Sequence, residues 1–298
     1  MQAVKVDGIS KSYGKLQAVD HLSLEVPAGT VYGLLGRNGA GKTTTIRMLM
    51  DILAPDEGAV RIYGEPMGAA VRDRIGYLPE ERGLYPKMKV NDVLQYLAAI
   101  HGVPRPVSQP RIDGWLERLE LSDWKTKKVQ ELSKGMQQKL QFVGTILHEP
   151  DLVILDEPFS GLDPVNVNLL KDILVELTRA GKTLVFSTHI MEQAEKLCER
   201  VCIIDKGRKV LDGNLTEIKE TYGKNTVVVS YEGDGAFLDD PTVARKDDYG
   251  QYVELSLIDG ADHQALLRRA MESARVSRFE VVHPSLNDIF IQQVGEGS

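Results

Sequence analysis

The chain lacks most sequence features that are typical of secreted proteins, membrane-spanning proteins and proteins stabilised by a structural metal. It contains two cysteines, Cys198 and Cys202, without the second pair that a zinc site would need. No apolar run approaches the roughly 20 residues that span a bilayer. The sequence also has no internal repeat and no low-complexity segment. We therefore expect both cysteines to pack in or near the core, since free cysteine is often buried.

Positive charge is also in deficit. The formal net charge of −7 argues against a general nucleic-acid binder, so we expect no nucleic-acid partner. Met1–Lys5 leads straight into an alternating strand pattern, so we expect no signal peptide and a cytosolic chain. A hydrophobic content of 42% is ordinary for a soluble globular protein, and 298 residues leave room for one large domain and one small one.

Short apolar stretches alternate with helical patterns up to about residue 222. The expected strands are 4–9, 22–26, 31–35, 60–64, 75–79, 152–155, 183–187 and 201–204, and the expected helices are 42–49, 167–177 and 190–197. Between 91 and 147 the pattern is helical, with a loop expected where Pro104, Pro106 and Pro110 lie. This order predicts a parallel α/β core with a helical insertion over about 87–148.

The character of the sequence changes near Tyr222-Gly223-Lys224. Beyond this point the expected strands are 226–231, 252–257 and 279–282, and the expected helices are 262–274 and 285–294. We therefore predict two domains, 1–222 and a small α+β domain over 223–298.

A phosphate-binding loop follows the buried strand 31–35. Gly36-Arg37-Asn38-Gly39-Ala40-Gly41-Lys42-Thr43 matches the G-x-x-x-x-G-K-[ST] pattern in full. Glycines let backbone N–H groups converge on phosphate oxygens, and the next helix directs its positive end at the same anion. Lys42 is expected to reach the outer phosphates of a nucleoside triphosphate, and Thr43 to ligate Mg²⁺.

Two carboxylates and a histidine follow later strands. Asp156-Glu157 ends the apolar run 152–155, at the sheet edge where open α/β proteins bind ligands. Asp156 is expected to hold Mg²⁺, and Glu157 to polarise the attacking water as a general base. His189 follows the strand 183–187 and is expected to hydrogen-bond the γ-phosphate.

Together these residues resemble the ATP-binding subunit of ABC (ATP-binding cassette) transporters, over roughly Val4 to Thr221. In that family Gly36–Thr43 is the Walker A loop, Leu152–Glu157 is Walker B, and Ser160-Gly161-Leu162-Asp163 is the D-loop. Leu132-Ser133-Lys134-Gly135-Met136 stands at the family signature, and His189 is the switch histidine. The resemblance implies an ATPase with a P-loop cassette fold, a helical subdomain, and ATP contacts by Tyr13 (on adenine), Gly36, Arg37, Asn38, Gly39, Ala40, Gly41, Lys42, Thr43, Thr44, Ser133, Gly135 and Asp163.

The sequence departs from the family pattern at two places, which concern the coupling between the nucleotide site and the membrane partner. Lys134 and Met136 replace a glycine and the glutamine of the usual Leu-Ser-Gly-Gly-Gln signature. Glu80 stands where the family has a glutamine, before the helical insertion. Its carboxylate can contact Mg²⁺ or the lytic water but cannot donate a hydrogen bond when ionised.

The family pairs two cassettes head to tail, so that each ATP lies between one Walker A loop and the partner's signature. On this basis Ser133 and Gly135 have no use within their own chain, and we expect a homodimer or a heterodimer with a related ATPase subunit. The implied partner is a separate integral-membrane permease, whose coupling helix would dock between the Glu80 loop and the helical insertion. The chain would then lie in the cytoplasm, on the inner face of the cell membrane.

The run Gly76–Met88 and the ending Pro284–Phe290 are similar to one branch of that family, which includes sodium-extrusion and drug-export ATPases. Export is therefore the expected direction, and the small C-terminal domain is either a dimer-stabilising appendage or a sensor of a small ligand. The alternative is a soluble ABC-class ATPase that acts on a non-membrane partner. Such proteins usually carry two cassettes in one chain or a long coiled coil, and this sequence has neither.

Overall fold

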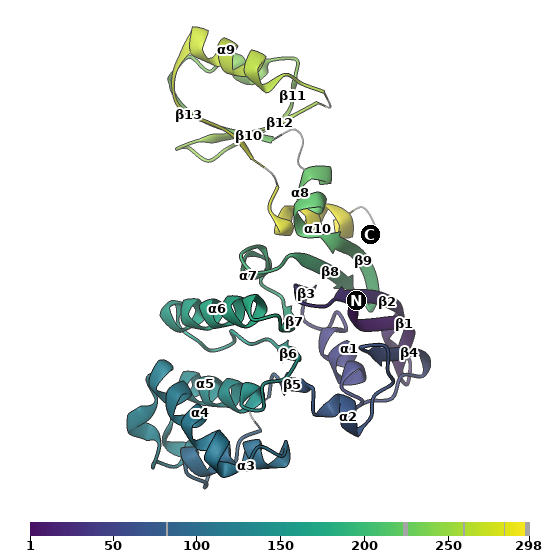
Figure 1. The fold of residues 1–298 in the computed structure, drawn as a ribbon. Coiled ribbons are helices and arrows are strands. Elements are labelled where there is room, and N and C mark those ends of the chain that lie inside the picture. Colours follow the sequence, from purple (N-terminus) through teal and green to yellow (C-terminus); the bar gives the residue numbers. More distant parts are fainter. Residues whose placement is uncertain (82, 223–225, 259, 283, 296–298) are drawn as a thin grey trace. The chain divides into compact units, whose positions relative to one another are not determined.

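The computed structural model describes residues 1–81, 83–222, 226–258, 260–282 and 284–295. The chain divides into two compact units, Met1–Gly213 and Asn214–Ser298 (Figure 1). The predicted boundary between Tyr222 and Gly223 stays a prediction, because Gly223 lies outside the described residues.

A six-stranded sheet forms the centre of the first unit. Its strand order is β5-β6-β7-β3-β8-β9. The strands are β3 (Val31–Leu35), β5 (Ile75–Leu78), β6 (Leu152–Asp156), β7 (Thr183–Thr188), β8 (Arg200–Asp205) and β9 (Arg208–Asn214). The pairs from β5 through β8 are parallel, and β3, β6 and β7 are buried along their whole length. This burial on both faces is the reason that these strands read as continuous apolar runs.

Three helices follow the carboxyl ends of strands in this sheet: α1 (Lys42–Leu49) after β3, α6 (Pro164–Arg179) after β6 and α7 (Met191–Glu195) after β7. The short α2 (Ala69–Arg72) precedes β5. Because β6, β7 and β3 are neighbours and parallel, the loops that follow them lie at one edge of the sheet. The predicted parallel α/β core is thereby confirmed, and the phosphate loop, Asp156-Glu157 and His189 lie at that edge.

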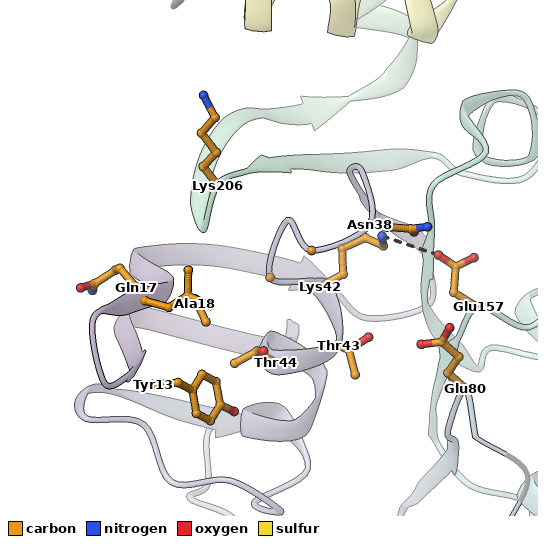
Figure 2. Close-up of a pocket in the computed structure, with 13 residues that line it drawn as sticks. Tyr13, Gln17, Ala18, Asn38, Lys42, Thr43, Thr44, Glu80, Glu157 and Lys206 are labelled. Carbon is orange, nitrogen blue, oxygen red and sulfur yellow. Dashed lines mark ion pairs between the residues drawn. The ribbon is translucent and has the colours of Figure 1, made fainter.

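A second, antiparallel sheet flanks the core and was not predicted as a separate layer. It contains β1 (Gln2–Tyr13), β2 (Leu16–Pro27) and β4 (Glu57–Ile62), in the order β2-β1-β4. Tyr13 pairs with Leu16 at the turn between β1 and β2. This turn lies beside the phosphate loop and supplies one wall of the site (Figure 2).

Three helices form the insertion: α3 (Val90–Ile100), α4 (Arg105–Arg118) and α5 (Lys134–Ile146). The predicted loop at Pro104, Pro106 and Pro110 is wrong, because α4 contains Pro106 and Pro110. Pro106 lies in the first turn, where no backbone donor is needed. Side chains also bind α4 to α3, since Ser108 Oγ donates to Gln95 Oε1 at 2.8 Å and Gln109 Nε2 donates to Asn91 Oδ1 at 3.0 Å.

The second unit is an α+β structure around its own core. Its elements are α8 (Leu215–Tyr222), β10 (Thr226–Gly233), β11 (Val243–Asp248), β12 (Val253–Leu257), α9 (His263–Ser273), β13 (Ala274–Val282) and α10 (Leu286–Gly295). The sheet has the order β11-β12-β10-β13, with antiparallel pairs throughout. Val229, Leu255 and Leu266 join sheet and α9 in one buried cluster. The predicted α+β character is confirmed, although β11 and α8 were missed.

Both cysteines are buried, as the sequence predicted. Cys198 Sγ lies against Gly33 of β3, where an added Cβ would approach the sulfur to 2.7 Å. Cys202 lies in β8 and is fully buried. Within the described residues, no helix is long and apolar enough to cross a membrane.

Candidate active site

A cavity of about 480 Å³ opens at the sheet edge where β3 and β6 end (Figure 2). It is lined by Tyr13, Leu16, Gln17, Ala18, Asn38, Gly39, Gly41, Lys42, Thr43, Thr44, Glu80, Glu157 and Lys206. Figure 2 shows Tyr13 and Gln17 at one end of this cavity and Glu157 and Glu80 at the other, with the phosphate loop between them. An elongated ligand with an aromatic ring and an anionic chain fits such a lining.

The phosphate loop follows β3 and can be formed only with glycine at certain positions. Gly41 has a φ of 107°, and a Cβ there would lie 2.5 Å from the carbonyl oxygen of Ala18. Gly36 has a φ of 155°, and its Cβ would lie 2.2 Å from the carbonyl oxygen of Ile204. Both contacts are with backbone, which cannot move aside, so the loop requires glycine for its shape.

The remaining predicted loop residues lie in the same turn, but not all of them line the cavity. Asn38 and Gly39 face it. Ala40 is buried, and its carbonyl accepts a hydrogen bond from the N–H of Gly207 at 3.0 Å. In the described part of the chain, Gly36, Arg37 and Ala40 are not among the residues that line the cavity.

Lys42 is buried at the start of α1 and its ammonium group lies inside the loop. Nζ donates to the carbonyls of Gly36 at 2.9 Å and Arg37 at 3.2 Å. It also lies 3.6 Å from Oε1 of Glu157. The loop thus holds a positive charge at its centre, facing the Glu157 carboxylate directly after β6 (Figure 2).

Glu157 and His189 come together although 31 residues separate them in sequence, because β6 and β7 are adjacent. Nδ1 of His189 lies 2.9 Å from Oε1 of Glu157. Glu157 itself has a φ of 49°, a conformation that non-glycine residues rarely adopt and that often marks functional positions. The three residues predicted to be catalytic, Lys42, Glu157 and His189, therefore form one contiguous group.

Ser187 holds this group in place and was not identified from the sequence. It pairs in register with Asp156 across β6 and β7. Its hydroxyl donates to Oδ1 of Asp156 at 2.5 Å and accepts the N–H of Glu157 at 3.0 Å. A serine at the end of a buried strand has no distinctive sequence signal, and only the strand pairing reveals its role.

Asp156 is fully buried, and burial raises the pKa of its carboxyl. The hydroxyl of Ser187, which donates a hydrogen bond to Asp156, lowers this pKa in part. The hydroxyl of Thr43 also lowers it, from a position outside hydrogen-bond geometry. Among the described residues, Oδ2 of Asp156 has no hydrogen-bond partner. A buried carboxylate oxygen without a donor is costly unless a cation compensates it. Asp156 and Thr43 therefore fit the hard oxygen ligands that Mg²⁺ prefers.

A second cavity, of about 490 Å³, adjoins the first. The two share Tyr13, Thr43 and Glu80 in their linings. The second is also lined by Arg47, Ile52, Leu53, Tyr77, Pro79, Glu81, Gly83 and Asp156. Glu80, predicted as a metal ligand, is exposed and lies on the wall between both cavities.

Gln141 of α5 connects the helical insertion to the Glu80 loop. Its Nε2 donates to the carbonyl of Glu81 at 3.2 Å and to that of Pro79 at 3.5 Å. The side chain is buried, so these bonds form away from water. A displacement of α5 would therefore move the loop that carries Glu80.

The signature residues require a correction. Ser133 was expected to have no use within its own chain, yet it is the N-cap of α5 and its side chain accepts the N–H of Met136 at 3.3 Å. Serine is favoured at this position because its hydroxyl satisfies a free backbone donor. Gly135 lies beside the D-loop, since a Cβ there would be 3.6 Å from the carbonyl of Gly161.

Asp163 likewise has a local role. It is the N-cap of α6 and accepts the N–H groups of Val165 and Asn166, each at 3.0 Å. These contacts hold the pKa of its carboxyl below the usual value, with the Asn166 N–H as the largest cause. As far as the structure describes the chain, Ser133, Gly135 and Asp163 line neither cavity.

Comparison with known proteins agrees with this geometry. The family model described as ABC transporter matches residues 19–160, and the model described as the C-terminal domain of DrrA1-3-like ATP-binding proteins matches residues 213–294. The chain is 45% identical over 291 residues to the uncharacterized ABC transporter ATP-binding protein YhaQ of Bacillus subtilis, covering 97% of this chain and 98% of the relative. It is 34% identical to the Nod factor export ATP-binding protein I of Paraburkholderia xenovorans, covering 98% and 97%.

Solved structures show the same likeness over most of the chain. A structure described as the ATP-binding subunit of an ABC transporter matches with a TM-score of 0.70 and 31% identity, covering 74% of this chain and 93% of the other. The cbiO1 protein of Clostridium perfringens, described as part of the transporter complex cbiONQ, matches with a TM-score of 0.63 and 26% identity, covering 74% and 94%.

Proposed function

This chain belongs to the ATP-binding subunits of ABC transporters and is an ATPase, and from that premise we propose that it powers export through a separate integral-membrane permease. Its similarity to Nod factor export ATP-binding proteins supports the direction of transport. The similarity to cbiO1, which is described as part of the ABC transporter complex cbiONQ, supports a permease on a separate chain.

ATP would lie along the first cavity, with adenine on Tyr13 and its phosphates in the loop from Gly36 to Thr44. The aromatic ring at one end and the backbone N–H groups of the loop at the other support this direction. Lys42 would turn from the loop carbonyls toward the outer phosphates. Its position, 3.6 Å from Glu157, supports this because both groups then face the γ-phosphate.

Glu157 would act as the general base that removes a proton from the attacking water, a contribution of about 10²–10⁴ in rate. The 2.9 Å contact with His189 supports this role, because the imidazole fixes the carboxylate while leaving its second oxygen for the water. His189 would also hydrogen-bond the γ-phosphate and keep the site closed during the reaction.

Mg²⁺ would be held by Thr43 and Asp156, with Glu80 as a further oxygen ligand. The buried, unpartnered Oδ2 of Asp156 supports this assignment. When bound, Mg²⁺ would neutralise charge on the β- and γ-phosphates. Asp156 remains aligned with the loop because Ser187 fixes its other oxygen.

Two copies of this chain, or this chain and a related subunit, would pair head to tail around ATP. One observation carries this step: Ser133 and Gly135 lie at the N-terminus of α5, outside the cavity that the loop forms in the described chain. Helix N-termini favour phosphate, so α5 can serve a nucleotide held by the partner. Ser133 would then cap its own helix and contact that nucleotide, and Asp163 would lie beside it.

The permease would dock at the second cavity, on the cytoplasmic side of the membrane. Ile52 in the lining of this cavity is 60% exposed, which supports the surface as a docking site. Outside the lining, Tyr85 of the loop before α3 and Tyr96 of α3 are 47% and 44% exposed. The Tyr85 and Tyr96 rings form an edge-to-face pair with centroids 5.4 Å apart. Because Glu80 lies between the two cavities, a helix seated there would sense whether ATP is bound.

The decisive experiment uses Glu157→Gln. This variant should bind ATP, hydrolyse it at least about 10²-fold more slowly, and accumulate as an ATP-bound dimer in size-exclusion chromatography with light scattering. Glu117→Gln, an exposed position of α4, is the matched control and should leave turnover unchanged. The mechanism is wrong if Glu157→Gln neither slows turnover nor traps a dimer.

The permease partnership has its own test. Co-expression with a candidate integral-membrane permease chain should allow both to be purified together and reconstituted in vesicles. ATP-dependent movement of a substrate out of the ATP-accessible compartment is the expected result. Stable ATPase activity without any associated membrane chain, in extracts where that chain is present, would favour a soluble partner instead.

A further inference from the structure

Lys206 lies at the tip of the β8–β9 hairpin and lines the nucleotide cavity, although the sequence offered no motif there. The turn consists of Lys206 and Gly207, with φ values of 48° and 80°. Positive φ at both central residues is typical of a type I′ hairpin turn, where asparagine and glycine are the preferred residues. A positive φ is unfavourable for the backbone of a lysine. Non-glycine residues in such conformations are concentrated at functional sites, so the Lys206 side chain is a candidate for a functional contact.

The hairpin tip is clamped between β2 and the phosphate loop. The N–H of Gly207 donates to the carbonyl of Ala40 at 3.0 Å, and its carbonyl accepts the N–H of Asp20 at 2.9 Å. A Cβ on Gly207 would lie 2.8 Å from the carbonyl oxygen of Ala18. The backbone of Lys206 therefore has a fixed position relative to the loop, and only its side chain is free to rotate.

The ammonium group of Lys206 is available to bind an anion in the cavity, whereas that of Lys42 already has partners. Two lysines and two glutamates line this cavity. Lys42 is engaged by two carbonyls and by Glu157. Lys206 is exposed, and within the described residues its ammonium group has no hydrogen bond or ion pair.

Its place along the cavity indicates which part of a nucleotide it meets. Figure 2 shows Lys206 above Gln17 and Ala18, toward the Tyr13 end and away from Glu157. The ammonium group points away from Lys42 in this view, but four side-chain bonds can rotate it over the loop. With adenine on Tyr13, which rests on the proposed function, the α-phosphate is the phosphate closest to the Tyr13 end of the cavity and therefore the one nearest to Lys206.

We propose that Lys206 is a nucleotide-binding residue that contacts the α-phosphate of ATP and ADP. The contact would be a charge-assisted hydrogen bond in a partly exposed setting. It would strengthen binding of any adenine nucleotide with an α-phosphate and would not take part in hydrolysis.

The test measures dissociation constants of the full chain by titration calorimetry with ATP, ADP, AMP and adenosine. Lys206→Gln should raise the Kd of all three nucleotides roughly 3- to 10-fold at low salt and leave adenosine unchanged. The difference should shrink as salt is added, because the pair is exposed. Lys206→Arg should bind like the unmodified chain, and Lys206→Gln should raise KM for ATP without lowering kcat.

Lys209→Gln is the matched control, since this lysine of β9 pairs with Asp212 at 3.3 Å and is not among the cavity-lining residues. Its nucleotide affinities should not change. The proposal is overturned if Lys206→Gln binds ATP and ADP normally at low salt, or if the loss is confined to ATP or extends to adenosine. A failure of the Tyr13 assignment is recognised separately, by unchanged adenosine affinity in Tyr13→Ala.

Discussion

At the scale of single residues, the site depends on one hydroxyl that bridges two functional groups. Ser187 satisfies both the Asp156 carboxylate and the N–H of Glu157. Glu157 adopts a positive φ of 49°, so its backbone is held in a strained conformation next to this bond. Ser187 is thus a positioning residue for both the proposed metal ligand and the proposed general base.

Replacing Ser187 by alanine should therefore affect stability and activity together. The buried Asp156 would lose a donor and the Glu157 N–H an acceptor, which costs about 1–3 kcal/mol in the free energy of unfolding. Turnover should fall about 10- to 100-fold, as for other groups that orient metal ligands. Urea denaturation and steady-state ATPase assays measure the two effects.

Ser108→Ala is the control for this prediction, because Ser108 is equally buried but lies in α4 and donates to Gln95 at 2.8 Å. It should lower stability by a similar amount and leave kcat unchanged. Equal effects of both variants on kcat would show that Ser187 acts on folding alone.

At the scale of elements, α4 shows how a helix can contain the residues that normally end one. Pro106 is at the second helical position, where it displaces no hydrogen bond. Pro110 lies inside the helix, where its ring replaces an N–H that would bond to residue 106. Hydrogen bonds from Ser108 and Gln109 to α3 keep the segment helical despite this loss. Tertiary contacts outweigh the local preference that predicted a loop.

Pro110→Ala should consequently stabilise the protein. Alanine restores the backbone N–H donor and is up to about 3 kcal/mol more favourable than proline inside a helix. The unfolded chain without Pro110 is more flexible, which offsets about 1 kcal/mol of that gain. We expect a net gain of about 1–2 kcal/mol in the free energy of unfolding, measured by urea denaturation. The exposure of Pro110 means that no packing is lost.

Pro106→Ala, one turn earlier and also exposed, provides the comparison and should change stability little or slightly lower it. If both alanine variants are destabilised alike, the proline rings themselves stabilise the turn and our account of α4 is wrong.

At the scale of the whole molecule, a histidine pair responds to pH. His101 follows α3 and His148 follows α5, and their rings stack with centroids 3.8 Å apart and an interplanar angle of 5°. Nε2 of His148 lies 3.1 Å from the carbonyl of Ile75 in β5, so the pair connects the helical insertion with the main sheet. Burial, with His101 as a second cause, lowers the pKa of His148 to about 4, and burial lowers the pKa of His101 as well.

Stability should therefore fall in acid. In the unfolded chain both histidines take up protons near pH 6.5, whereas the folded chain keeps them neutral, so the unfolded state binds more protons below that pH. The stability that the two neutral histidines contribute is fully present above about pH 6.5 and is lost as the pH falls toward about 4. Asp73 opposes the shift at both rings, and Lys182 supports it at His148.

His148→Gln tests this because glutamine can still donate to Ile75 but does not titrate. Its denaturation midpoint should decline less between pH 7.5 and 5.5 than that of the unmodified chain. His21→Gln serves as the control, since Asp20 raises the pKa of this exposed histidine and its removal cannot reduce the loss in acid. An identical decline in the His148 variant and the unmodified chain would contradict the assignment.

The accuracy of sequence-based prediction varied with the kind of feature. The strand 31–35 and the helix 42–49 were predicted with the bounds that the structure has, because buried strands and the phosphate loop have strong local patterns. The strands β9 and β11 were missed, since both are largely polar or half-exposed. In the site, the phosphate loop, Asp156, Glu157 and His189 had motifs or strand ends to identify them. Ser187, Gln141 and Lys206 had none.

The sequence by itself determined the family, the phosphate loop and the acidic strand end, because glycine spacing and apolar runs are local properties that each segment expresses alone. Only the tertiary structure decided which distant side chains meet: Ser187 with Asp156, His189 with Glu157, and Lys206 with the cavity. The order of the strands and the position of the β8–β9 hairpin determine these side-chain contacts, and neither can be read from a single segment of the sequence. The same applies to Ser133, whose role as a cap depends on where α5 begins.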